Sequence, residues 1–167
     1  PDLNDGISAK MQYHAADYAA PGTEIICRSP QRGVHSVDNA FTHSIAAVSV
    51  CEELLRSEQE EGGYDAYVIA CFWNPGLRAC REITTKPVVG IGDAALLLSR
   101  QLGERPALLC VGGGSYLYRE GIARLGMQDC MAAVKVVDIA SEESFSHPEH
   151  TLEKLVCAAR EAVHQDG

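Results

Sequence analysis

The chain has 167 residues, a formal net charge of −9 at pH 7 and a hydrophobic fraction of 46%. This length and apolar content suffice for one domain with a sizeable buried core, which argues against disorder. The 14 lysines and arginines are scattered, and nucleic-acid backbones bind concentrated positive charge, so nucleic acid is a poor candidate partner. No apolar run reaches the roughly 20 residues of a membrane span, so we expect a soluble protein.

Cysteine is frequent and odd in number, and no two cysteines form a Cys-x-x-Cys pair. Disulfide frameworks use even counts, and zinc sites use closely spaced ligand pairs, so neither is predicted. We expect reduced thiols in a cytoplasmic protein, most of them packed as small buried hydrophobic residues. The seven are Cys27, Cys51, Cys71, Cys80, Cys110, Cys130 and Cys157.

The first part of the chain predicts helices and one short strand. Residues 5–20 have a helical pattern that ends at Pro21-Gly22, residues 23–28 are a β-type run, and residues 29–36 are rich in loop formers. A long helical pattern then opens at Asp38 and ends, after a charged tail, at Gly62-Gly63.

Residues 66–71 are apolar with almost no alternation, which is typical of a strand covered on both faces. Seven further elements follow: a helix over 77–83, a strand over 87–91, a helix over 94–102 with Asp93 as its N-cap, a strand over 107–111, a helix over 116–125, and a final strand and helix over 134–139 and 149–164. Strands that alternate with helices predict an α/β fold with a mainly parallel sheet and helices on both faces.

Ligands of open α/β sheets gather beyond the carboxyl ends of the strands. The segments in that position are residues 28–29, 71–74, 92–93 and 112–115.

Cys71 is the sharpest candidate, because it ends the most apolar strand and precedes a helix that starts near Gly76-Leu77. Amide groups of the loop and the helix dipole would favour a thiolate there. A cysteine at a strand end can also simply pack, so both readings stand on position alone. Cys80, inside the short helix, is expected to face a core.

Other motifs carry weaker signals. The glycines at 112–114 lack the Lys-Ser/Thr of a P-loop and the Gly-x-Gly-x-x-Gly of a dinucleotide site, so they favour a turn or a site for a small anionic or carbonyl group. His35 and His43 are conceivable bases or metal ligands, but no His-x-x-x-His pair is present, and surface or structural roles are favoured.

Residues 64–77, continued by Arg81-Glu82 and residues 87–95, resemble the hydantoin racemase branch of the aspartate/glutamate racemase superfamily. That branch reads roughly Cys-Phe-x-Asp-Pro-Gly-Leu, followed by Pro-Val-Val-Gly-Ile-x-Glu-Ala-Ala. Weaker similarity covers nearly the whole chain, including residues 1–4.

The resemblance implies two similar α/β lobes with the site between them, no cofactor or metal, a small-molecule substrate and a homo-oligomer. It makes Cys71 the catalytic thiol, one of two cysteines that act on opposite faces of the substrate. Substrate contacts are expected from Phe72, Trp73 and Asn74 in the loop after the strand, and from Gly112 and Gly113.

The chain departs from the family pattern at several places. Asn74 stands where Asp is usual, Asp93 where Glu is frequent, and residues 110–113 replace a threonine pair. The second cysteine of the family belongs to a later Gly-Cys-x-Gly-Met segment. We therefore expect residues 1–167 to be a racemase-like domain that lacks the first strand and the C-terminal segment with that cysteine.

The function implied is inversion of a carbon next to a carbonyl by cysteine proton transfer, on 5-substituted hydantoins or allantoin. Two alternatives stay open: a one-thiol decarboxylase or isomerase of small dicarboxylates, and a non-catalytic domain of the same fold.

Overall fold

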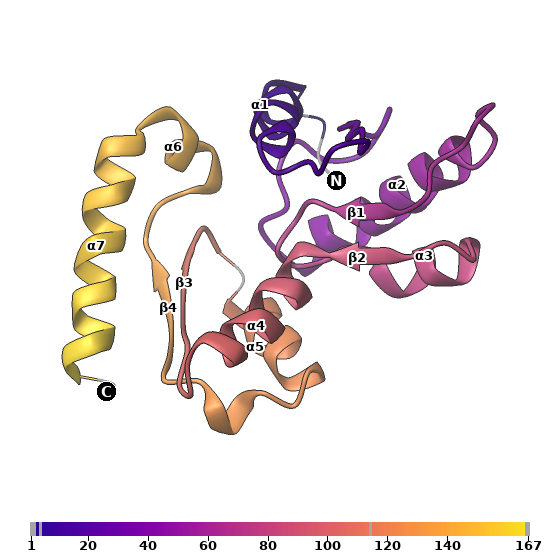
Figure 1. Ribbon diagram of the computed structural model, residues 1–167. Helices are drawn as coiled ribbons and strands as arrows, with labels where there is room; N and C mark the ends of the chain where they lie inside the picture. Colours follow the sequence, from indigo (N-terminus) through magenta and orange to yellow (C-terminus); the bar gives the residue numbers. More distant parts are fainter. Residues whose placement is uncertain (1–2, 4, 114, 166–167) are drawn as a thin grey trace.

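The computed structural model of the protein describes residues 3, 5–113 and 115–165. Helices alternate with short parallel strands along this part of the chain (Figure 1), which confirms the predicted α/β class. In chain order the elements are α1 (Asp5–Ala16), α2 (Ala40–Ser57), β1 (Tyr67–Ile69), α3 (Leu77–Ile83), β2 (Val88–Gly90), α4 (Ile91–Leu102), β3 (Ala107–Val111), α5 (Ser115–Arg124), the 3-10 helix η1 (Gln128–Cys130), β4 (Ala133–Val137), α6 (Ser141–Ser146) and α7 (Pro148–Gln165).

The strands pair in two separate parallel sheets, β1 with β2 and β3 with β4. Each pair is joined by a crossover that contains a helix, α3 in the first and α5 in the second, as parallel strands require. Helix α7 packs along β3 and β4, while α2 and α3 pack beside β1 and β2 (Figure 1). The arrangement as two similar lobes with a site between them stays a prediction.

Each pair of strands has its own hydrophobic core. Leu54 of α2 and Ile69 of β1 pack with Leu77, Cys80 and Val88 in the first. The second is formed by Leu96, Ile122 and Met127, with further side chains of β3 and β4 against them. Burial of each large apolar side chain contributes about 1.5–3 kcal/mol, so these clusters fix the helices on their strands.

One face of the first sheet is open. Val68 of β1 is 65% exposed and Val89 of β2 is 43% exposed, whereas Ile69 is 5% exposed. Successive side chains of a strand point to opposite faces, and the helices α2 and α3 cover only the face of Ile69. The prediction that residues 66–71 are covered on both faces was therefore wrong.

The β-type run at residues 23–28 does not form a strand. The side chain of Gln12 in α1 bonds the carbonyl of Ile25, and its Oε1 accepts the amide of Cys27 at 2.6 Å. A strand needs a neighbouring strand to satisfy its backbone, and here a glutamine side chain takes that place.

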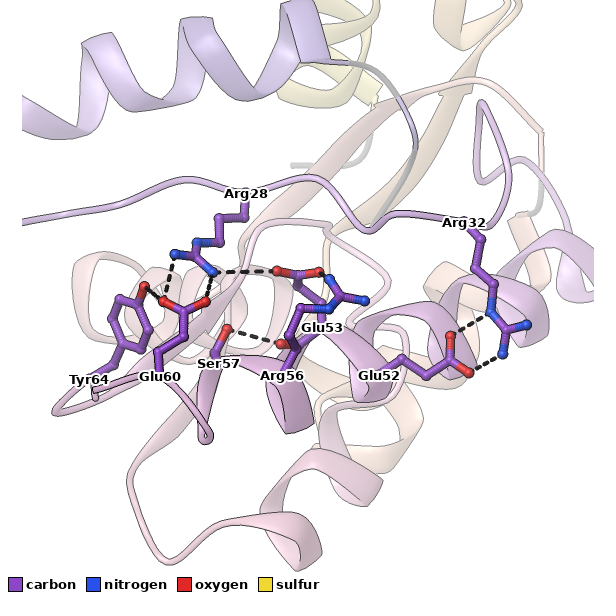
Figure 2. A network of polar contacts seen from close by, with 8 residues as sticks. All are labelled: Arg28, Arg32, Glu52, Glu53, Arg56, Ser57, Glu60 and Tyr64. Carbon is purple, nitrogen blue, oxygen red and sulfur yellow. Dashed lines mark hydrogen bonds and ion pairs between the residues drawn. The ribbon is translucent and has the colours of Figure 1, made fainter. Parts of the chain in front are cut away.

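A network of charged side chains fastens this extended segment to α2 and the turn that follows it (Figure 2). Arg28 pairs with Glu60 and with Glu53, and its guanidinium carbon lies 5.4 Å from the centre of the Tyr64 ring. The Tyr64 hydroxyl donates to Glu60 at 2.8 Å. The Arg28 guanidinium holds the pKa of Glu60 below its usual range.

Several predicted helix bounds differ in the structure. Helix α1 ends at Ala16 and not at residue 20. Helix α2 begins at Ala40 and not at Asp38, and its N-cap, Asn39, forms a capping box with Thr42. Helix α4 begins at Ile91 with Gly90 as its N-cap, so Asp93 lies within the first turn and the N-cap prediction for it was wrong. Its carboxylate contacts other side chains, described below. Among the described residues, no helix is long and apolar enough to cross a bilayer.

Candidate active site

Cys71 lies just beyond the carboxyl end of β1, as expected, and it is partly exposed. A thiol that reacts with a ligand must be reachable, and a thiol sealed in hydrocarbon would not be. The placement of Cys71 therefore meets the first requirement of a catalytic role.

The loop after Cys71 is a tight turn with two residues in the left-handed region. The Asn74 amide donates to the Cys71 carbonyl at 2.9 Å, with Asn74 at φ 50° and Gly76 at φ 73°. A Cβ at Gly76 would lie 2.9 Å from the carbonyl oxygen of Ala47 in α2. Glycine is needed here because the chain turns toward α3 directly against the backbone of α2.

Asn74 anchors this loop to the start of α4. Its Nδ2 donates to Asp93 Oδ1 at 2.7 Å, its Oδ1 accepts the Gly92 amide at 3.1 Å, and the residue is only 7% exposed. A Cβ at Gly92 would lie 1.8 Å from the Phe72 carbonyl oxygen. The loop and the N-terminus of α4 therefore touch backbone to backbone.

Asp93 is paired on its other side with Arg124 at the end of α5. Nη1 of Arg124 donates to Oδ2 at 3.0 Å and Nη2 to Oδ1 at 2.6 Å, a two-pronged contact. The hydrogen bond to Asp93 raises the pKa of Arg124 above its usual value. The buried carboxylate thus has both a cation and an amide as partners.

Tyr118 of α5 joins the loop of Cys71 to the end of β3. Its ring centre lies 5.8 Å from that of Phe72 and 5.2 Å from that of Trp73, and its hydroxyl donates to the Val111 carbonyl at 3.2 Å. Burial raises the pKa of Tyr118 to about 12, and the neighbouring Cys110 adds to the rise. Tyr118 is therefore a neutral, buried bridge between this loop and β3.

The glycine loop is held by its backbone. Gly112 has φ 82° and donates its amide to the Ile139 carbonyl at 2.7 Å. A Cβ at Gly113 would lie 3.1 Å from the carbonyl oxygen of Asp38. Gly114 lies outside the described residues. The Gly112 amide is consequently engaged within the fold, while the close approach at Gly113 brings this loop to the start of α2.

His43 of α2 lies against the candidate site, whereas His35 is exposed in the loop before α2. His43 Nε2 is 3.1 Å from the Trp73 carbonyl oxygen. Trp73 Nε1 is buried without a hydrogen-bond partner among the described residues. The indole lies near Tyr118 and partly offsets the rise in the pKa of the Tyr118 hydroxyl. Across residues 3, 5–113 and 115–165, no three His, Cys, Asp or Glu side chains are grouped to hold a metal.

The other cysteines are placed differently from Cys71. Cys80 is buried, as predicted, with its sulfur 3.8 Å from that of Cys51, and burial raises its pKa. Cys110 is buried too, and burial raises its pKa to about 11. Both are held as neutral thiols. Cys157 is exposed on α7.

The structure brings two of the four predicted strand-end segments into direct contact. Residues 71–74 and 92–93 meet through Asn74, and Tyr118 links residues 71–74 to Val111, the last residue of β3 before the glycine loop. Arg28 is occupied by Glu60 and Ser29 by Ser8, at an Oγ–Oγ distance of 2.7 Å. The first segment therefore belongs to the packing of the N-terminal region.

Sequence reasoning missed Tyr118 and Arg124. Tyr118 stands four residues before Ile122 and shares its buried face, so the spacing predicts a core residue and gives no hint of the loops it touches. Arg124 carries no local signal, because its partner Asp93 is 31 residues away.

Comparison with known proteins identifies the family. The sequence pattern of the Asp/Glu/Hydantoin racemase family matches residues 4–167. The chain belongs to this family. It is 32% identical over 170 residues to the hydantoin racemase of Paenarthrobacter aurescens, covering 100% of this chain and 71% of that protein. It is 33% identical over 167 residues to the hydantoin racemase of Pseudomonas sp. (strain NS671), covering 99% of this chain and 66% of that protein.

Solved structures of family members have the same fold. The allantoin racemase from Klebsiella pneumoniae superposes with a TM-score of 0.93 at 30% identity, covering 100% of this chain and 68% of that one. The allantoin racemase from Pseudomonas fluorescens gives a TM-score of 0.91 at 25% identity, covering 99% and 69%. The predicted family and the racemase class are confirmed. The roles of individual residues stay predictions.

Proposed function

We propose that the protein is a cofactor-independent racemase in which the Cys71 thiolate removes a proton from a carbon next to a carbonyl. The observation that carries this proposal is the position of Cys71. The residue is partly exposed just beyond the end of a parallel strand, in a loop anchored on α4 and α5, in a chain of the racemase family.

The substrates that best fit are five-membered cyclic ureides, namely 5-substituted hydantoins or allantoin. Similar proteins are a hydantoin racemase over 71% of its length and an allantoin racemase over 68% of its chain. In such a ring the reacting carbon lies between a carbonyl and a ring nitrogen. Removal of its proton gives an enolate whose charge spreads onto oxygen, which makes the carbon accessible to a modest base.

The reaction balances with one base and one acid. The Cys71 thiolate takes the proton, and the electron pair of the broken C–H bond moves onto the carbonyl oxygen. A second acid on the opposite face returns a proton to the carbon, which inverts the centre and leaves Cys71 as a thiol. Cys80 and Cys110 do not suit that second role, because both are buried and could not reach a substrate bound beside Cys71.

Substrate contacts are proposed for the loops around Cys71. Phe72 and Trp73 supply aromatic surface, and Gly112 and Gly113 shape the facing loop. The side chain of Asn74 is bonded to Gly92 and Asp93, and its amide to the Cys71 carbonyl. Asn74 would therefore contact the substrate through its backbone carbonyl, which can accept a second hydrogen bond beside that from Leu77. The small cavity behind the loop measures about 20 Å³, room for about one water. The substrate would therefore bind on the outer side of the loop. A cytoplasmic homo-oligomer completes the proposal.

The test is solvent exchange at the reacting carbon. The native protein is incubated with one enantiomer of a 5-substituted hydantoin in deuterium oxide, and optical rotation and deuterium at C5 are followed against a blank without protein. Loss of rotation together with deuterium incorporation is expected. The variant Cys71→Ala should abolish both above the blank, while Cys157→Ala, which alters an exposed cysteine of α7, should leave them intact.

Two outcomes would overturn the proposal. Exchange that persists in Cys71→Ala would exclude this thiol as the base. Release of carbon dioxide from a small dicarboxylate, without exchange of any ureide, would select the one-thiol alternative.

A further inference from the structure

We propose that Arg124 is a positioning residue for Cys71 and acts through Asp93 and Asn74. The inference rests on the proposed function, since it assigns a further residue to the same site. None of the three side chains needs to touch the substrate for this role.

A continuous series of hydrogen bonds joins the guanidinium to the catalytic loop. Arg124 donates twice to Asp93, at 3.0 and 2.6 Å, and Asp93 accepts from Asn74 Nδ2 at 2.7 Å. The backbone amide of Asn74 then donates to the Cys71 carbonyl at 2.9 Å. The position of the Cys71 backbone is thus tied, through three contacts, to the end of α5.

The hydrogen bonds of the Asn74 side chain fix the backbone conformation of the loop at Asn74. This residue has φ 50°, a left-handed conformation that is uncommon for a residue with a side chain and costs of order 1 kcal/mol or more. Such a conformation persists when surrounding contacts hold it. Here both ends of the Asn74 side chain are held, by Asp93 and by the Gly92 amide.

Arg124 in turn keeps Asp93 in place. Asp93 is 9% exposed, and a buried carboxylate that loses its cation loses the partner that holds it in place and draws in water. Water that competes for Asp93 Oδ1 would weaken the bond from Asn74 Nδ2. The double hydrogen bond from Arg124 to Asp93 is therefore needed to keep the loop that carries Cys71 in this position.

Helix α5 holds the loop at a second point as well. Tyr118, on the same helix, packs its ring against Phe72 and Trp73. The two contacts fall at different points of the turn, one at its central residues Phe72 and Trp73 and one at its last residue, Asn74. Loss of Arg124 would leave the aromatic contact and release the other, so the loop should shift without unfolding of the core.

Three variants of the native protein test the proposal. Arg124→Met removes the charge and the fork, Arg124→Lys keeps the charge without the fork, and Arg119→Met is the matched control because Arg119 is exposed on the same helix. Racemisation gives kcat and KM. Independently of any activity, alkylation of Cys71 by iodoacetamide is followed by peptide mass spectrometry, with the exposed Cys157 as internal reference.

For Arg124→Met we expect kcat to fall about 10- to 100-fold with KM changed much less, the pattern of a misplaced reacting group. The rate of Cys71 alkylation should rise relative to that of Cys157, because the released loop exposes the partly buried sulfur. Arg124→Lys should recover part of kcat, and Arg119→Met should match the parent in both measurements.

An Arg124→Met protein in which the Cys71 alkylation rate does not rise would overturn the proposal, as would one that loses thermal stability while kcat at 25 °C is unchanged. If Arg124→Met fails to fold, Arg124→Lys decides by the same two criteria. Absence of racemisation in the parent would contradict the proposed function alone, because the alkylation arm still reports on the positioning of Cys71.

Discussion

Asn74 Nδ2 donates to Asp93 Oδ1 at 2.7 Å, between the loop of Cys71 and the first turn of α4. These are the two positions at which the chain departs from the family pattern around the catalytic loop. An amide and a carboxylate can hold this contact with no proton shared between them. Two carboxylates at the same distance could do so only if one of them bound a proton.

The variant Asn74→Asp should therefore make activity depend on pH in a new way. Two facing carboxylates raise the pKa of the pair. Near neutral pH the hydrogen bond between residues 74 and 93 is therefore lost, and it forms again when the pair takes up a proton on acidification. Arg124, which faces Asp93 from α5, and Glu120 near Arg124 are the other charged groups of this cluster. We expect kcat/KM to recover relative to the parent as the pH is lowered from about 8 to 5.

The matched control for this variant is Asn39→Asp. Asn39 is exposed and caps α2, a position where aspartate serves as well as asparagine. Its pH profile should follow that of the parent. A profile of Asn74→Asp that also follows the parent would contradict the account of the anchor.

Gly92→Ala should disrupt the same contact by steric means. The added Cβ would lie 1.8 Å from the Phe72 carbonyl oxygen and 2.8 Å from its carbon, so the loop must move. Overpacking of this kind costs about 1–3 kcal/mol, and both the free energy of unfolding and kcat should fall.

By contrast, a Cβ at Gly121 in α5 meets nothing within 4 Å. Gly121→Ala should raise stability by roughly 0.5–1 kcal/mol, because alanine favours the helix. Equal urea midpoints for the two variants would refute this.

Much of the fold could be predicted from the sequence where one segment carries its own pattern. Residues 77–83 and 107–111 form α3 and β3 with the bounds predicted. The run at 23–28 failed because β-type residues make a strand only where another strand pairs with them, and Gln12 met that backbone instead. Helix α6 and η1 were missed because short helices leave little periodicity to detect.

The same distinction, between residues with a local sequence pattern and residues with distant partners, holds for the site. Cys71 could be found because it ends an apolar run, and the family pattern surrounds it. Tyr118 and Arg124 could not, because each acts on a loop more than 30 residues away in the chain, as the 31-residue separation of Arg124 from Asp93 shows. The predicted N-cap role of Asp93 was wrong for the same reason. Partners distant in sequence, not the local pattern, determine what its carboxylate contacts.

The network of Figure 2 predicts a loss of stability at low pH. The pKa of Glu60 is lowered from 4.5, first by the hydrogen bond from Arg28 and then by that from Tyr64. A lowered pKa stabilises the fold above the ordinary value, and this stabilisation is lost as the pH falls through the folded-state pKa. Glu60→Gln should thus lower Tm at pH 7, and the difference in Tm from the parent should narrow below pH 4.5.

Glu61→Gln, an exposed neighbour, is the control. High salt should also shrink the difference, since the pair is partly exposed. A difference that persisted in acid would exclude the ion pair as its cause.

The buried hydroxyl of Tyr118 predicts a loss of stability at high pH. Burial raises its pKa to about 12, whereas an unfolded tyrosine titrates near 10. Its contribution to stability is complete below about pH 10 and is lost as the pH rises toward 12, at up to ~1.4 kcal/mol per pH unit. At pH 7, Tyr118→Phe should cost about 1 kcal/mol through the lost hydrogen bond to Val111.

Because phenylalanine does not ionise, the parent should lose stability more steeply than Tyr118→Phe above pH 10, so that the two unfolding free energies converge. Tyr116→Phe, which alters a tyrosine of α5 that is 66% exposed, serves as the control and should keep the slope of the parent. Burial raises the pKa of Cys110 to about 11, and Cys110 interacts with Tyr118, so its titration differs between the parent and Tyr118→Phe. All three proteins are therefore compared in a Cys110→Ala background, which removes that titration. Parallel curves for the parent and Tyr118→Phe in urea unfolding between pH 9 and 12 would show that the phenol is not held neutral by burial, and the bridge between the loop of Cys71 and β3 would then need another explanation.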